Sequence, residues 1–393
     1  MNALNKWSYI HPTKIVSGAG CLKEIGQHAQ PYGKSVMLVV DPSLQKFHAN
    51  SIELIQTSLH ENGVKVVVFN QVKPNPVLPD VQQGAVIAKQ NAVDLMIGLG
   101  GGSTMDTARA IAVAATHPGT AMDYLYFSKT QPTEKTLPMI QIPTTSGTGS
   151  HVTCCSVITD PAKDFKSALW NQDQLFAKVA LIDPELMKTV PAAITASTGF
   201  DVFTHSFESF INVNASPYTD LLAVESVRLV IENLPTAFKD GGDITARANL
   251  AWADTLAGMC IANAGTTLPH AMGQPISGHY PHVSHGQSLA VIYPAFLEYT
   301  AEAAIDKFSQ VAGLFNPSLK TTDAHCAALA LKDEIVKFLK EINMYYTFDD
   351  FDIPKEGIEA VLTHCMEFPD VNVNPKVPDG DAVRDLYMKS FAS

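Results

Sequence analysis

The chain has 393 residues, of which 46% are hydrophobic and 17% are charged. This composition is globular, not disordered, and the chain is long enough for two domains with substantial cores. A formal net charge of −12, with no cluster of lysine or arginine, argues against nucleic acid as a partner, so small molecules are the expected ligands.

The six cysteines include one adjacent pair but no C-x-x-C pattern. This usage favours free thiols in a reducing compartment over a disulfide framework or a thiolate metal site. The first residues lack the apolar stretch of a signal peptide, and no apolar run approaches the roughly 20 residues needed to cross a bilayer. We therefore expect a cytoplasmic protein without a membrane partner.

The first half of the chain alternates strand-like and helix-like segments. Buried-strand patterns occur at 35–40, 64–69, 93–98 and 137–142,. Helical patterns occur at 44–60, 80–89 and 104–115,. Alternation of this kind predicts a Rossmann-like α/β domain with a mostly parallel sheet.

The pattern changes near Asp183–Pro191. Beyond it, glycine and proline separate long alanine- and leucine-bearing runs, and strand-like alternation is scarce,. We expect an α/β dinucleotide-binding domain over residues 1–184, followed by an all-α domain over residues 185–393. The predicted helical runs lie at 217–234, 245–262, 288–302, 303–314 and 322–342.

Small-residue loops follow two of the predicted strands. The first, Gly100–Ser103, precedes a predicted helix, where bare backbone and free N–H groups can meet a diphosphate. Ser103 is expected to cap that helix. The spacing is not G-x-G-x-x-G, and a tight strand-to-helix turn is the alternative interpretation. The second loop, Thr144–Ser150, offers hydroxyls and backbone donors for a cofactor or substrate.

Asp41 ends the first predicted strand and directly precedes a proline. A carboxylate at this place can bond an adenosine ribose hydroxyl and repel a 2′-phosphate, which favours NAD over NADP. A turn-forming Asp-Pro pair is the alternative.

A candidate metal centre combines two distant stretches. Asp201 and His205 stand four residues apart, so on a helix they share one face. His270 and His285 bracket a run with glycines and prolines that predicts a loop,. One carboxylate and three imidazoles suit Fe²⁺ or Zn²⁺. For Asp201 and His205 alone, an ordinary helix-surface pair is the alternative.

Together these motifs resemble the iron-containing (group III) alcohol dehydrogenase family over the whole chain. The segments that carry the resemblance are Gly100–Ser103 with Asp106, Pro143–Ser150, Thr198–Glu208, His270–Met272, His285–Gly286 and Asn374–Lys376.

The resemblance implies NAD, a divalent metal (Fe²⁺ or Zn²⁺) and a homo-oligomer, with a dimer expected. It implies that the metal ligands are Asp201, His205, His270 and His285. The implied cofactor contacts are Asp41, Asn75, Gly100, Gly101, Gly102, Ser103, Asp106, Thr144, Thr145, Thr148 and Lys166.

Several positions depart from the family pattern. His151 stands where a glutamate is usual, and Gln274 stands where a second histidine often follows. The spacing from His270 to His285 is one residue longer than usual, so His282 is a rival fourth ligand. Without the second histidine, the proton relay must use another group, and His279 is favoured over His282 and His151.

We therefore expect an NAD- and metal-dependent alcohol dehydrogenase or aldehyde reductase. Because His151 and Gln274 add polarity, a polyhydroxylated or acidic substrate, such as a sugar acid, is a further hypothesis. One alternative is a lyase like dehydroquinate synthase, which also uses NAD and a metal but needs a cluster of lysines and arginines that the second half lacks. Another is a catalytically silent nucleotide-binding protein of the same fold.

Overall fold

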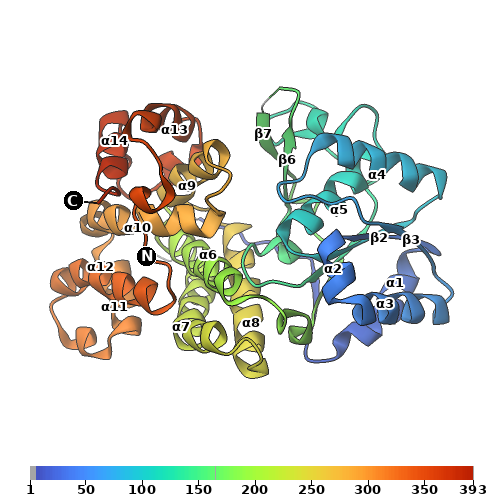
Figure 1. Cartoon of the computed structure of the whole chain (residues 1–393), viewed down its shortest axis with the longest axis horizontal. Coiled ribbons are helices and arrows are strands. Elements are labelled where there is room, and N and C mark those ends of the chain that lie inside the picture. Colours follow the sequence, from blue (N-terminus) through green and yellow to red (C-terminus); the bar gives the residue numbers. More distant parts are fainter. Residues whose placement is uncertain (1–5, 164, 393) are drawn as a thin grey trace. The chain divides into compact units, whose positions relative to one another are not determined.

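The computed structural model describes residues 6–163 and 165–392. It divides the chain into two compact units (Figure 1). The first is Ile10–Val190. The second begins at Pro191 and also includes the described residues that precede Ile10.

The first unit is built on a six-stranded sheet in the order β1-β8-β5-β4-β2-β3, in which every pairing is parallel. The central strands are apolar and buried, as expected where helices cover both faces of a parallel sheet,. This confirms the predicted Rossmann-like sheet. The strands are β1 (Lys14–Ser17), β2 (Ser35–Val40), β3 (Lys65–Phe69), β4 (Leu95–Gly100), β5 (Met139–Pro143) and β8 (Val179–Ile182). A separate antiparallel ribbon pairs β6 (Cys155–Asp160) with β7 (Phe165–Trp170).

Helices α1 and α3 lie on one face of this sheet, and α4 and α5 lie on the other (Figure 1). Ile25 and Leu59 pack with Leu38 and Ile97 in the core beneath α1 and α3. The single helix predicted at 44–60 is two helices, because His48 takes a non-helical conformation between them. The helices are α1 (Ile25–Ala29), α2 (Pro42–Phe47), α3 (Ala49–Glu61), α4 (Leu78–Gln90) and α5 (Gly102–Ala114).

The second unit is helical, and no strand occurs in its described residues. Stacked and edge-on aromatic rings of Phe200, Phe203, Phe207, Tyr293 and Phe308 lie at the centre of its core. None of the helices within 6–163 and 165–392 is both long and apolar enough to span a membrane. The helices are α6 (Ala192–Ile211), α7 (Pro217–Lys239), α8 (Ile244–Ile261), α9 (Leu268–His279), α10 (His285–Thr300), α11 (Ile305–Phe315), α12 (Ala324–Glu341), α13 (Ile358–Cys365) and α14 (Gly380–Met388).

The prediction of a loop between His270 and His285 is wrong for most of that range. Helix α9 continues through Pro275 to His279, and only residues 280–284 connect it to α10. An internal proline removes a single helical hydrogen bond. Burial of Met272 and Ile276 offsets that loss,.

Candidate functional site

Helix α6 carries a buried polar stripe. Asp201, His205 and Glu208 stand at positions i, i+4 and i+7, so they share one face of the helix. Their exposed fractions are 4%, 6% and 0%. Buried polar groups in such numbers require partners.

Three imidazoles converge on one oxygen of Asp201. Its Oδ1 lies 3.6 Å from Nε2 of His205, 3.7 Å from Nε2 of His270 and 3.6 Å from Nε2 of His285. Asp201, His270 and His285 form a group whose ligand atoms all lie within 4.8 Å of one another. Three of the four predicted ligands, from α6, α9 and α10, thus form one group, and the fourth, His205, lies outside this group but close to Asp201.

This cluster fits a divalent metal. In the described residues, Oδ1 of Asp201 and Nε2 of His270 are buried without a hydrogen-bond partner. Such atoms are costly unless a ligand satisfies them. Tetrahedral coordination with bonds of 2.0–2.1 Å puts neighbouring ligand atoms about 3.4 Å apart. Distances of 3.6–3.7 Å from Asp201 Oδ1 are within a few tenths of an ångström of that value.

Glu208 fixes the orientation of His270. Its Oε1 lies 2.8 Å from Nδ1 of His270, and its Oε2 accepts a 2.8 Å hydrogen bond from the backbone N–H of Thr267, the N-cap of α9. A proton on Nδ1 leaves Nε2 of His270 as an acceptor that faces Asp201. One buried carboxylate therefore sets both the start of α9 and the tautomer of its histidine.

The first turn of α10 presents His285. A capping box between Ser284 and Gln287 begins the helix at this residue,. Gly286 lies so close to α6 that an added Cβ would come within 2.2 Å of the carbonyl oxygen of Ser197. The His285 side chain is 38% exposed, so the cluster is open on this side.

The charges of the cluster are coupled. Burial would raise the pKa of Asp201, but His205, His285 and His270 outweigh burial and lower this pKa to about 2,. Burial would lower the pKa of His270, but Glu208 and Asp201 raise it to about 10. The two carboxylates thus favour a proton on His270, and a metal bound at this ring would have to compete with that proton.

The other histidines of this region have different partners. His282 Nε2 lies 2.9 Å from the carbonyl oxygen of Phe351. His279 Nε2 lies 2.8 Å from Nδ1 of His364, on α13. Both of these contacts are with residues other than Asp201. The relay role of His279 stays a prediction.

The glycine loop packs directly on the second small-residue loop. An added Cβ would lie 3.3 Å from Oγ1 of Thr145 at Gly101, and 2.7 Å from the side chain of Thr148 at Gly102. The backbone N–H of Thr144 donates to the carbonyl of Gly100. An added Cβ at Gly102 would therefore require Thr148 to move, and the glycines leave the backbone at the start of α5 bare, as a diphosphate requires,.

Asn75 and Lys166 join this loop. Ser103 Oγ accepts a hydrogen bond from the Asn75 backbone N–H at 3.3 Å, and Lys166 Nζ donates to Asn75 Oδ1 at 3.1 Å. Asn75 takes a left-handed conformation, φ 54°, which asparagine adopts more readily than most residues other than glycine,. The predicted N-cap is wrong, because Gly101 holds that position and Ser103 lies inside α5.

Asp41 and Asp106, the two acidic residues predicted to contact the cofactor, have different hydrogen-bond partners. Asp41 is the N-cap of α2 and accepts a 2.7 Å hydrogen bond from the Ser43 backbone N–H. Asp106 accepts hydrogen bonds from Ser150, Arg109 and the backbone of Val157 at 2.7, 3.1 and 3.0 Å. The Asp106 carboxylate therefore ties α5 to the second loop and to β6.

His151 does not face a substrate. Its side chain is fully buried, so the interpretation that it adds polarity to a substrate cleft is wrong. Burial, with His11 and Arg109 nearby, lowers the pKa of His151 to about 3. The ring is neutral in the folded protein and belongs to the core of the first unit.

His151 is expected to make the protein acid-sensitive. An unfolded histidine takes up a proton near pH 6.5, whereas the folded ring does so only near pH 3. The unfolded state therefore binds more protons between these values, and His151 lowers stability as pH falls, by up to about 1.4 kcal/mol per pH unit. His151→Phe should flatten the loss of Tm between pH 7 and pH 4. The exposed residue His60 offers the control His60→Gln, and equal slopes for both variants and wild type would contradict the expectation.

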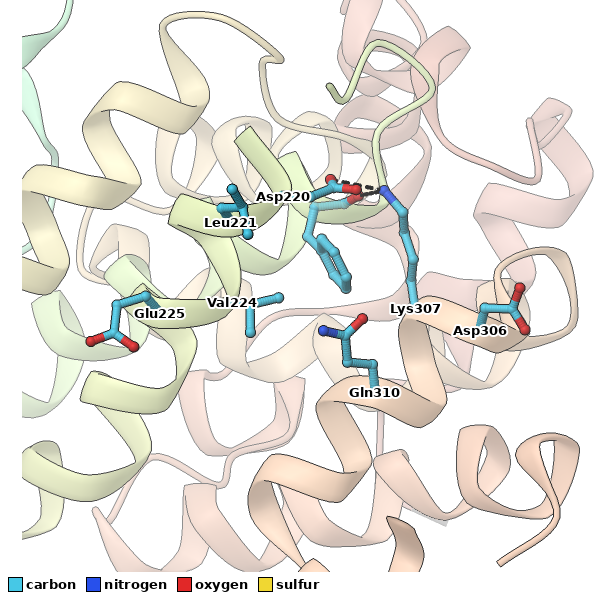
Figure 2. A pocket seen from close by; sticks show the side chains of 8 residues that line it. Asp220, Leu221, Val224, Glu225, Asp306, Lys307 and Gln310 are labelled. Carbon is cyan, nitrogen blue, oxygen red and sulfur yellow. Dashed lines mark hydrogen bonds and ion pairs between the residues drawn. The ribbon is translucent and has the colours of Figure 1, made fainter. Parts of the chain in front are cut away.

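A cavity of 320 Å³ in the helical unit is separate from this cluster. Figure 2 shows its lining, in which the ammonium group of Lys307 reaches Asp220. Lys307 donates to Asp220 Oδ1 at 3.1 Å and to the carbonyl of Phe210. Its charge is already satisfied, and none of the four clustered ligands lines the cavity.

A parallel α/β unit joined to a helical unit with a histidine–carboxylate cluster is the architecture of the metal-containing alcohol dehydrogenases. Residues 12–184 match the model of the iron-containing alcohol dehydrogenases, and residues 195–391 match that of the Fe-containing alcohol dehydrogenase family, C-terminal part. The chain belongs to the iron-containing alcohol dehydrogenase family. It is an oxidoreductase that acts on alcohols.

Relatives cover nearly the whole chain. Long-chain-alcohol dehydrogenase 1 of Geobacillus thermodenitrificans is 33% identical over 379 residues, which are 95% of this chain and 94% of the relative. The crystal structure of a 1,3-propanediol oxidoreductase has a TM-score of 0.93 at 29% identity and covers 98% of this chain and 100% of its own. That of sulfoacetaldehyde reductase from Bifidobacterium kashiwanohense in complex with NAD⁺ has a TM-score of 0.87 at 29% identity, with 98% of each chain covered.

Proposed function

We propose that the protein is an NAD-dependent, metal-dependent alcohol dehydrogenase whose Fe²⁺ or Zn²⁺ is held by four residues of the helical unit. The observation that carries the proposal is the convergence of three imidazoles on a buried, unsatisfied carboxylate oxygen. The four residues are Asp201, His205, His270 and His285.

The cluster suits catalysis at an alcohol oxygen. A divalent ion held there would act as a Lewis acid on that oxygen. Asp201 supplies a negative charge in a buried setting, where charges interact more strongly than in water. The buried rings of His205 and His270 exclude water, and the part-exposed ring of His285 leaves an approach for a small substrate.

The loops of the first unit support a dinucleotide cofactor. NAD would exchange a hydride with the carbon that bears the alcohol oxygen. Gly100, Gly101 and Gly102 would hold its diphosphate at the start of α5, with Asn75 and Lys166 beside them. The NAD⁺ complex of the related sulfoacetaldehyde reductase supports this cofactor. The Asp41 carboxylate, at the end of β2, favours NAD over NADP.

Metal analysis of the purified protein, paired with an NADH-linked assay over alcohols and aldehydes, tests the proposal. Wild type should hold close to one Fe²⁺ or Zn²⁺ per chain, and His285→Ala should lose both metal and turnover. His282→Ala is a matched control, because His282 bonds to Phe351 and not to the cluster. A wild-type protein with neither metal nor turnover, or metal that survives in His285→Ala and is lost in His282→Ala, would refute the ligand set.

A further inference from the structure

Gln274 lies on the same face of α9 as His270. The two residues are one helical turn apart, and Ser277 continues the stripe three residues later. Ser277 Oγ donates to Ser288 Oγ at 3.2 Å, and Ser288 Oγ donates to the carbonyl of His285 at 2.7 Å. The rings of His270 and His285 are 5.2 Å apart. Gln274 therefore lies between two contacts of α9 with the first turn of α10, beside the proposed metal ligands.

The amide of Gln274 is available to a ligand. Gln274 is half-buried, and in the described parts of both units no residue forms a hydrogen bond with its side-chain amide. The neighbouring polar side chains differ, because Gln287 caps Ser284 and Glu208 bonds to His270 and Thr267. A primary amide offers two donors and one acceptor, which is what a hydroxyl needs in order to donate and accept at once.

We propose that Gln274 binds a second, neutral oxygen of the substrate, so that the enzyme favours diols over simple alkanols of the same length. This inference rests on the proposed function, because it places the reacting oxygen at the metal. Side chains one turn apart have Cβ atoms about 5–6 Å apart. This is the scale on which a hydroxyl of the neighbouring or next carbon can reach the amide.

The chemistry favours a hydroxyl over an acid group. The ion pairs of Asp201 are made by histidines alone in the described structure. Arg247 and Lys307 of the same unit bond to Thr195 and Asp220. A neutral amide offers a carboxylate or sulfonate no charge to pair with, whereas a hydroxyl can both donate to it and accept from it. Of the two hypotheses, we therefore favour a polyol over a sugar acid as the substrate.

The test compares kcat/KM for propane-1,2-diol, propane-1,3-diol and propan-1-ol in wild type and in Gln274→Leu, with metal content measured on the same samples. Leucine keeps the bulk and removes the hydrogen bonds. The ratio of the better diol to propan-1-ol should fall about tenfold, as loss of one hydrogen bond predicts. Calorimetry on the metal-loaded protein should show weaker binding of that diol by a similar factor.

Gln310→Leu, on the exposed surface of α11, should leave every ratio unchanged. An unchanged diol preference in a metal-loaded Gln274→Leu variant would overturn the role of Gln274 while leaving the proposed function intact. A wild type that turns over propan-1-ol at least as well as both diols would also overturn it. Absence of metal and of all turnover in wild type would overturn the proposed function itself, and this inference with it.

Discussion

Replacement of Glu208 by glutamine is expected to weaken metal binding about 10- to 100-fold, the usual cost of removing the hydrogen-bond partner of a ligating histidine. The Glu208 carboxylate accepts from Nδ1 of His270, which leaves Nε2 free to bind metal. A glutamine amide can instead donate to Nδ1, and the proton then moves to Nε2, where it opposes the metal.

The dissociation constant for Zn²⁺, measured by competition with a chelator, is the appropriate measurement. Glu225→Gln is the control, since Glu225 lies on the surface of α7 and pairs with Arg228. The effect should also appear in the visible spectrum of the Co²⁺-loaded protein, because His270 would ligate the ion more weakly. If Glu208→Gln lowers Tm and leaves metal affinity unchanged, the carboxylate serves only to begin α9.

Gly286→Ala should displace His285 and so disrupt the metal centre through packing alone. The added methyl would lie 2.2 Å from the carbonyl oxygen of Ser197 and 2.5 Å from its hydroxyl, so α10 must move away from α6. We expect a loss of about 1–3 kcal/mol of stability and metal binding weakened about tenfold or more. Thermal unfolding and metal titration measure the two effects.

Gly278→Ala provides the matched control on the preceding helix. No atom lies within 4 Å of a Cβ built on Gly278, and alanine is favoured over glycine in a helix by about 1 kcal/mol. This variant should be as stable as wild type or slightly more stable, with normal metal content. Equal behaviour of the two alanine variants would show that α10 does not depend on close contact at Gly286.

The alternation of strands and helices could be predicted from the sequence because the central strands are buried on both faces. Such strands are continuous apolar runs, and β2 begins and ends where its pattern does,. The short strands β1 and β8 have only four residues each. Four residues are too few to show a strand pattern in the sequence. The predicted loop after His270 was wrong because Pro275 and Gly278 are turn signals that tertiary burial of α9 overrides,.

The four clustered ligands were predicted from spacing and resemblance, and the structure places them together. The roles of Glu208 and Gly286 were not predicted. Glu208 shares a helix face with Asp201, which is a signal that the sequence offers. The contact of Gly286 with Ser197 joins residues far apart in the chain, and only tertiary structure can show it. The burial of His151 likewise depends on packing that the residue type does not indicate.

All four proposed metal ligands lie between Asp201 and His285, within one compact unit, and every predicted nucleotide contact lies in the other. The distances among these four residues are therefore internal to one unit. The proposed metal set thus needs no residue of the nucleotide-binding unit, and we expect the protein to keep its ion when the nucleotide is removed by dialysis.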